Sequence, residues 1–409
     1  MQTLCPEHGV WTRISQSLRG TGVSATSLTP PAPSRTLVSH AGRRRAPSGR
    51  ERPVTAEAWA SLVDGLASAG RHLEESTAAL DPQERADGYR ALLRAANNLF
   101  GRFETDPEAP ELVPFNGWRQ KFFLDNPDYR YWIADISGRH EYRLAGNIGD
   151  SVYQSITVYT GRGVADAAAV ARIDSDGLDV DDDGEFTLTL SPDRRPSPSH
   201  LHLPAEATSV WVRYVHDRSR PADEGDCRIT RCGAPDRVPV PDAAEFARDL
   251  AKLGKVLAQV PAVFELSTAR DIKSPNSVRH WSAMTGGAAF TEPGIHYLRG
   301  AWELGPGEAL VVEGPLVDCR HWNIVLYSRF LNSLDYRHRT VSRTGAGAHT
   351  AGGAYRFVLA ARDPGIAGYD WLDTEGRNFG VFVMRFLQPC GTPELPSVRS
   401  VPIADLGPT

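Results

Sequence analysis

Residues 152–159 of the chain are Val-Tyr-Gln-Ser-Ile-Thr-Val-Tyr. Val152, Gln154, Ile156 and Val158 alternate in this run with Tyr, Ser and Thr residues. A period of two residues is typical of a β-strand whose two faces meet different surroundings. Similar runs, at residues 141–144, 185–190 and 209–216, lie close by in the sequence. We therefore expect an antiparallel sheet in this part of the chain.

The period of two residues returns in the C-terminal third of the chain. The expected strands there are residues 297–304, 309–313, 322–331, 355–361 and 381–387. A turn of Gly305, Pro306, Gly307 and Glu308 joins the first two of them. Short strands at such spacing, with few helices between them, indicate antiparallel β-sandwich or jelly-roll-like units. The predicted fold class is accordingly mainly β.

Helical periodicity appears in three places. Trp59, Leu62, Val63 and Leu66 recur at helical spacing, and residues 89–103 repeat that period. We expect these two runs to form an antiparallel helical pair. A further helix should begin after Asp242, because Asp242 and Glu245 make a plausible capping box ahead of a three-four apolar stripe.

Composition changes along the chain suggest its boundaries. Residues 1–50 contain seven Arg but one acidic residue, and they have no apolar run, which is typical of disorder. Residues 218–240 are polar and rich in Pro and indicate a linker. The predicted order is a disordered segment at 1–54, a helical pair at 55–110, a first β unit at 111–217, a linker at 218–240, an inter-unit helix at 241–265 and a second β unit at 266–409.

Charge and cysteine content restrict the partners and the compartment. The formal net charge is -5, from 45 basic and 50 acidic residues, so nothing in the balance attracts nucleic acid or an anionic membrane. The five cysteines are an odd number at irregular spacing, which argues against a disulfide framework and favours the cytoplasm. The sequence also has no phosphate-binding glycine motif, no Gly-x-Ser-x-Gly and no His-Glu-x-x-His. No cofactor is expected, and the expected partner is a small-molecule substrate or ligand.

Residues 321–327 are His-Trp-Asn-Ile-Val-Leu-Tyr, and with residues 331–339 they resemble the most recognisable segment of a bacterial family labelled "domain of unknown function 1214". Two further matches are residues 362–365 with 371–374, and residues 125–129 with Tyr131. The resemblance spans roughly residues 85–390. It implies a β-sandwich-like fold in which these blocks lie near one another, and it implies no reaction.

Two carboxylates in the second block suggest one kind of chemistry. Asp363 and Asp373 flank a Gly-rich loop that contains Tyr369 and Trp371. Two acids beside aromatic rings suit glycoside hydrolysis, in which one acid protonates the leaving oxygen and the other serves as nucleophile or base. The alternative is structural, because Asp-Pro-Gly forms turns and Asp373 can cap one through backbone N–H groups.

The first block supplies the other expected site residues. Asp335, Tyr336, Arg337 and His338 follow a strongly apolar strand, and the end of a strand is a usual place for a site. Arg337 could hold an anionic group in bidentate fashion, or it could belong to a structural ion-pair network with Asp335. We expect Asp335, Tyr336, His338, Asp363 and Asp373 to be catalytic, and Tyr327, Asn332, Arg337, Trp371, Asn126 and Asp128 to bind substrate, with the blocks converging on one pocket.

A metal site is a weaker expectation. His200 and His202 lie on one face of an extended segment, and Glu206 follows four residues later, which is half of a cupin-like pattern. The framing glycines and a second half are missing, so exposed histidines at a strand end are the simpler interpretation.

The sequence leads to two candidate functions, of which the first is preferred. One is an enzyme of the hydrolase or lyase type that acts on a small oxygenated or glycoside-like metabolite by acid-base catalysis. The other is a non-catalytic β-sandwich that binds a glycan or small molecule. Two carboxylates facing each other across an open cleft would favour the first.

Overall fold

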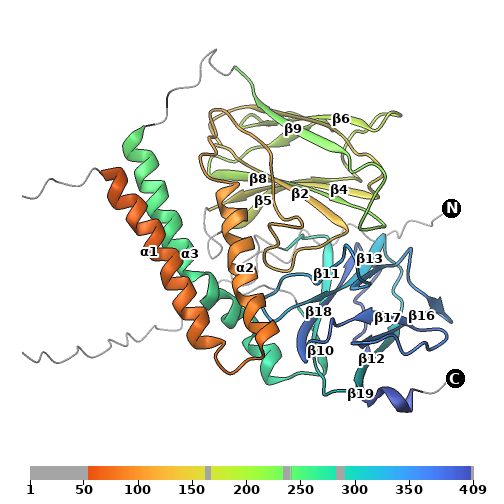
Figure 1. Cartoon of the computed structure of the whole chain (residues 1–409). Helices are drawn as coiled ribbons and strands as arrows, with labels where there is room; N and C mark the ends of the chain where they lie inside the picture. Colours follow the sequence, from red (N-terminus) through yellow and green to blue (C-terminus); the bar gives the residue numbers. More distant parts are fainter. Residues whose placement is uncertain (1–53, 162–166, 234–239, 241, 282–290, 407–409) are drawn as a thin grey trace, which may run out of the picture. The chain divides into compact units, whose positions relative to one another are not determined.

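The computed structural model describes residues 54–161, 167–233, 240, 242–281 and 291–406 (Figure 1). The predicted disorder of residues 1–54 therefore lies almost wholly outside the described residues. The described part is mainly β and contains three α-helices, α1 (Val54–Ser76), α2 (Pro82–Phe100) and α3 (Ala243–Lys273). No helix among the described residues is long and apolar enough to cross a membrane.

Two sheets share the first hydrophobic core. One has the strand order β1-β2-β8-β4-β5, and the other has the order β7-β6-β3-β9. Their bounds are β1 (Val113–Pro114), β2 (Tyr129–Asp135), β3 (Tyr142–Asn147), β4 (Tyr153–Thr160), β5 (Ala168–Asp174), β6 (Glu185–Ser191), β7 (His200–His202), β8 (Ala207–Val215) and β9 (Asp226–Arg231). Leu144 and Leu188 of one sheet pack with Ile156, Val158 and Val212 of the other. We call these two sheets the first sheet pair.

Two further sheets share a second core and form the second sheet pair. The first has the order β10-β11-β18-β13-β14, the second has the order β15-β16-β12-β19, and β17 joins β16 in parallel. Their bounds are β10 (Ser277–His280), β11 (Ile295–Glu303), β12 (Glu308–Pro315), β13 (His321–Tyr327), β14 (Ser342–Thr344), β15 (Thr350–Ala351), β16 (Ala354–Ala360), β17 (Asp370–Asp373), β18 (Phe379–Leu387) and β19 (Ser397–Pro402). Trp302, Ile324, Phe357 and Met384 fill this core.

A third core, which we call the central core, lies where strands of both sheet pairs meet α2 and α3. Tyr129 and Tyr153 from the first pair pack there with Val325 and Val383 from the second, and Phe264 of α3 joins them. On β13, Val325 and Tyr327 face the central core, whereas Ile324 and Leu326 face the core of the second sheet pair. The strand is therefore buried on both faces, which explains why apolar residues follow one another without alternation from Ile324 to Tyr327.

The expected strands are largely present, but the expected linker and helix bounds are wrong. Residues 226–231, inside the predicted linker, form β9 and pair with β3. Their Cys-Arg-Ile-Thr run was too short and too polar to be recognised as a strand. The helix expected at residues 241–265 continues to Lys273, because Thr268 and Asp271 keep a buried face on it.

The helical pairing in the structure also differs from the expected one. The side of α1 that packs is made by Ala58 and Leu62, which join Leu250 and Leu257 of α3 in one cluster. Figure 1 shows α1 and α3 side by side. Trp59, which the apolar pattern placed on the buried face, is 60% exposed. Two glycines determine how α1 packs on α3. A Cβ on Gly65 would collide with the backbone of Gly254, so the two helices are too close together at this point for larger residues.

We therefore expect Gly254→Ala to destabilise the chain by about 1–3 kcal/mol, because the added methyl group must push the backbones of α1 and α3 apart. Gly70→Ala is the matched control in α1, since a Cβ there meets no atom within 4 Å and alanine favours the helix. Urea unfolding of both variants measures the difference. Equal free energies of unfolding would contradict the close helix contact.

Candidate functional site

The largest of the cavities described here opens beside the start of β2 and has a volume of about 690 Å³. We call it the outer cavity. Tyr131 and Trp132 of β2 line it, together with Trp118 from the preceding loop and Tyr336 from the segment after β13. The rings of Trp118 and Tyr336 meet edge to face with centroids 5.1 Å apart. The remaining lining includes Asn116, Asp125, Asn126, Arg130, Arg220, Glu224, Arg337 and His338.

Local turns place these side chains. Asn126 Oδ1 accepts a hydrogen bond from the backbone N–H of Asp128 at 3.1 Å, which closes the Asn-Pro-Asp turn that opens β2. Asn116, with φ 74°, accepts the N–H of Phe122 at 2.8 Å and shapes the loop that carries Trp118. Asp335 Oδ1 accepts the backbone N–H groups of Arg337 and His338. That carboxylate thus orders the turn from which Tyr336 and Arg337 reach the cavity.

Positive charge predominates on the wall of the outer cavity. Arg130 pairs with Glu224 at 2.7 Å, and Asp125 accepts hydrogen bonds from the N–H and Oγ of Ser333. Arg337 lies over the Trp118 ring, with its guanidinium carbon 4.8 Å from the ring centroid. Arg220 donates to the Arg337 carbonyl. An aromatic surface with arginines at its edge is suited to a planar or anionic small molecule.

A smaller cavity of about 200 Å³, the side cavity, also has Trp118 in its wall and is lined further by Lys121, Asn332 and Asp335. Lys121 is 1% exposed. Its Nζ donates to the carbonyls of Ser333 and Leu334 at 2.7 and 2.8 Å, and it lies 4.3 Å from the Trp118 ring centroid. Burial lowers the pKa of Lys121 from 10.5 to about 8. The amine is therefore partly neutral in mildly basic solution.

A third cavity, the inner chamber, holds about 30 Å³ and shares Asn116, Tyr129 and Tyr131 with the outer cavity. Its other walls include Trp281, Tyr297, Arg213, Glu292 and Arg385. Arg385 is 4% exposed and donates to the Tyr327 hydroxyl and to the Leu124 carbonyl, both at 2.9 Å. Burial raises the pKa of Tyr297 to about 12, so its phenol is neutral at physiological pH.

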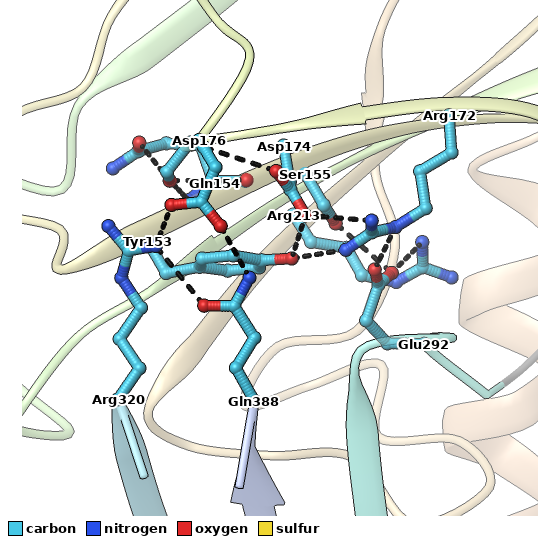
Figure 2. A network of polar contacts seen from close by, with 11 residues as sticks. Tyr153, Gln154, Ser155, Arg172, Asp174, Asp176, Arg213, Glu292, Arg320 and Gln388 are labelled. Carbon is cyan, nitrogen blue, oxygen red and sulfur yellow. Dashed lines mark hydrogen bonds and ion pairs between the residues drawn. The ribbon is translucent and has the colours of Figure 1, made fainter. Parts of the chain in front are cut away.

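Glu292 connects the inner chamber to a polar network (Figure 2). Its carboxylate accepts Arg172 Nε at 2.7 Å, Arg213 Nη1 at 3.1 Å and Ser155 Oγ at 3.0 Å. Arg172 also pairs with Asp174 at 2.7 Å. Further out, Asp176 pairs with Arg320 and accepts Gln388 Nε2. The network joins β4, β5 and β8 to residues beside β11, β13 and β18, and so fixes one wall of the inner chamber.

The structure brings some of the expected site residues together. Tyr336, Arg337, His338 and Asn126 line the outer cavity, and Asn332 and Asp335 line the side cavity. Burial alone would raise the pKa of Asp335, but hydrogen bonds from the His338 ring and from two backbone N–H groups lower it below its usual value. Asp335 is therefore an ordering carboxylate, ionised at physiological pH.

The expectation that all the blocks converge on one pocket is wrong. Tyr327 is fully buried in the central core. Asp363 accepts the N–H of Gly365 in an exposed turn, and Trp371 packs on the outer face of β16, with Nε1 bonded to the Ala360 carbonyl. Asp373 pairs with Arg339 at 2.7 Å and caps Glu375. β17 pairs with β16, in the sheet of the second pair that does not contain β13. None of the three cavities is therefore lined by Asp363, Trp371 or Asp373.

Asp128 also lies elsewhere than expected. It is 1% exposed and accepts Asn323 Nδ2 at 2.7 Å. Burial raises its pKa. Asp128 therefore holds the start of β2 against β13 and does not line the outer cavity.

The histidines of β7 do not assemble a metal site with Glu206. His200 Nε2 lies 2.9 Å from Ser191 Oγ, and Glu206 is exposed. Across the described ranges, no three His, Cys, Asp or Glu side chains gather in a way that could hold a metal ion.

Four residues at these cavities were not among those expected from the sequence: Lys121, Arg213, Glu292 and Arg385. Two of these residues could have been recognised from the sequence pattern. Arg213 and Arg385 are lone charged residues in the otherwise apolar or neutral strands ATSVWVRYV and FGVFVMRFL. A charge inside a buried strand must have a partner or a function, so such positions can be found by pattern alone.

Comparisons with known proteins support the family resemblance and the arrangement of the sheets. Residues 121–216 match the model of a family described as "Protein of unknown function (DUF1214)". The resemblance stated from the sequence is thereby confirmed over those residues, which include the block at 125–131 but not the two later blocks. None of the curated proteins compared with the chain matches it.

Among solved structures, an uncharacterised protein from Burkholderia cenocepacia is similar in fold, with a TM-score of 0.80 and 26% sequence identity over 86% of this chain and 99% of that one. A protein from Vibrio parahaemolyticus has a TM-score of 0.42 and 12% identity over 84% of this chain and 100% of that chain. The first of these comparisons supports the arrangement of the sheets described above.

Glu292→Gln should destabilise the chain by about 3 kcal/mol or more, because it leaves the buried Arg213 guanidinium without a carboxylate and takes one of the two carboxylates from Arg172. Asp176→Asn is the matched control, since its pair with Arg320 is solvent-exposed and should contribute at most about 1 kcal/mol. The measurement is urea unfolding at neutral pH. Similar losses in the two variants would contradict the importance of the buried pairs.

Lys121 should leave a signature in the pH dependence of stability. Its pKa is about 8 in the folded chain against 10.5 ordinarily, so the unfolded chain binds more protons between these values. The free energy of unfolding should therefore rise with pH across this window, relative to Lys121→Met, by about 1–3 kcal/mol. Below the window both states hold the proton and the difference should be constant. Parallel stability curves for the two proteins would contradict the lowered pKa.

Proposed function

We propose that the chain binds a small molecule in the outer cavity without transforming it chemically. The observation that carries this proposal is the aromatic wall of Trp118 and Tyr336 with Arg337 stacked on it, in a cavity of about 690 Å³. Such a cavity has the size and the mixture of aromatic and polar groups typical of ligand sites. Aromatic rings suit the faces of sugars and planar molecules, and the arginines supply directed hydrogen bonds.

The arrangement of the carboxylates gives less support to glycoside chemistry. That reaction requires two carboxyl groups facing each other across a gap of about 5–9.5 Å. Asp373 is held by Arg339, Asp363 closes a turn, and Asp335 orders its own turn. Each of the three carboxylates therefore has a structural role where it lies.

An enzyme of the hydrolase or lyase type, acting on a small oxygenated metabolite, is the second candidate function. The observation that favours it is Lys121, whose pKa of about 8 would let the amine act as a general base at the side cavity. The bonds from Lys121 Nζ to two carbonyls favour a structural role instead, which is why binding is preferred.

Two further expectations belong to the proposal. We infer that each sheet pair is a β-sandwich, because the two sheets of a pair share one hydrophobic core. We also retain the cytoplasm as the compartment. The free thiols of Cys227, Cys232 and Cys319 support that assignment.

Calorimetric titration with neutral probes tests the proposed site. Catechol, phenol and glucose cover planar and polyhydroxylated ligands, and at least one of them should bind saturably. Trp118→Ala should weaken that binding about tenfold or more, because it removes the ring on which the probe packs. Trp59→Ala is the matched control, because Trp59 lies exposed on α1 outside the outer cavity.

Equal binding by Trp118→Ala and the wild type would show that the outer cavity is not the site. Chemical conversion of a probe, lost in Lys121→Met, would favour the enzyme over the binding protein.

A further inference from the structure

Arg385 is a buried cation without a carboxylate partner among the described residues. It lies on the face of β18 that carries Val381 and Val383 and points toward the central core. A guanidinium has five N–H donors, and the Arg385 group donates to the Tyr327 hydroxyl and to the Leu124 carbonyl, neither of which is charged. Withdrawing a charge from water is unfavourable unless another charge or a full set of hydrogen bonds replaces the water.

A neighbouring polar group at the inner chamber lacks a hydrogen-bond partner. The Tyr129 hydroxyl is buried and has no hydrogen-bond partner, although Tyr129 lines both the inner chamber and the outer cavity. Electrostatic interaction with Arg385 is one of the influences on the pKa of Tyr129, so the two groups are neighbours. Tyr297 adds a hydroxyl that accepts the N–H of Glu292 and keeps its own proton to donate. The inner chamber therefore offers donors of hydrogen bonds in excess of acceptors.

The charged groups around the inner chamber also leave one positive charge unmatched. In the network of Figure 2, Arg172, Arg213 and Arg320 are matched by Asp174, Asp176 and Glu292. Arg385 lies outside that balance. Asp128 is within electrostatic reach of Arg385, but its carboxylate accepts the Asn323 amide and forms no direct ion pair with Arg385. One more negative charge would complete the chamber.

The size and position of the chamber limit what can supply that charge. A volume of about 30 Å³ has room for one or two waters or one carboxylate, since a single water needs roughly 10–15 Å³ by this measure. Asn116, Tyr129 and Tyr131 line both the chamber and the outer cavity, so the two spaces are adjacent. An acid group could therefore enter the chamber while the rest of the molecule stays in the outer cavity.

We propose that the inner chamber binds the carboxylate of a small carboxylic acid whose remaining part occupies the outer cavity. The planar carboxylate matches the planar donor array of Arg385, and the Tyr129 hydroxyl donates a further hydrogen bond to it. This inference rests on the proposed binding function and deepens it, because it names the class of ligand.

Calorimetric titration with benzoate, benzamide and inorganic phosphate tests the inference. Benzamide has the shape of benzoate without its charge, and phosphate has charge without the ring. Benzoate should bind at least about tenfold more tightly than either. Tyr129→Phe should weaken benzoate binding about tenfold and leave the melting temperature unchanged or higher, because the lost hydroxyl has no partner in the protein.

A matched control is Tyr355→Phe. The Tyr355 hydroxyl is likewise buried and unpartnered, but it lies in the core of the second sheet pair, so its loss should leave benzoate affinity unchanged. Arg385→Met should abolish benzoate binding in a protein that remains folded by circular dichroism. Because the Arg385 variant can fail to fold, the result for Tyr129→Phe decides the question by itself.

The outcomes separate the two proposals. Equal affinity for benzoate and benzamide, tighter binding of phosphate, no saturable benzoate binding, or an unchanged affinity in Tyr129→Phe would each overturn the carboxylate site. If Trp118→Ala weakens probe binding while Tyr129→Phe does not, the outer cavity alone binds the ligand and the proposed function stands. If neither variant alters saturable binding of the probes, both proposals are wrong.

Discussion

The burial of β13 and β18 on both faces is the constraint on which the rest of the fold depends. Odd-numbered residues such as Val325 and Val383 fill the central core, and even-numbered residues such as Ile324 and Met384 fill the core of the second sheet pair. A strand in this position cannot shift by one residue without exchanging its two sets of side chains between two cores. The polar residues on these strands are held equally firmly, which is why Asn323 and Arg385 meet fixed partners.

Much of the fold could be predicted from the sequence, for physical reasons that the particular segments make clear. β4, β6 and β8 were predicted from alternating sequences and all three form strands, although only β6 alternates between buried and more exposed side chains, while β4 and β8 are buried almost throughout. β9 was missed because its six residues lie at the edge of a sheet and bury one side chain only, Ile229. The partner of α1 was misjudged because Trp59 and Val63 suggested a buried face, whereas backbone contact at Gly65 and Gly254 decides the packing.

The candidate site could be predicted from the sequence less completely than the fold. The aromatic and polar residues after β13 were expected at a cavity, and Tyr336 and Arg337 do line one. Asp363 and Asp373 have residue types as suitable for chemistry, yet turns and an ion pair account for both. The inner chamber arises from residues as distant in the sequence as Tyr129, Glu292 and Arg385. Such a site follows from the packing of strands from different sheets, which local patterns do not encode.

The order of the elements along the chain also has a consequence for synthesis on the ribosome. Every described strand of the first sheet pair precedes α3, so this half has all its strands before the helix emerges. α1, in contrast, is made first but packs chiefly on α3, so its apolar face waits for most of the chain to be translated. Nascent α1 is therefore the element most in need of a chaperone or of a temporary contact, whereas the first sheet pair can mature early.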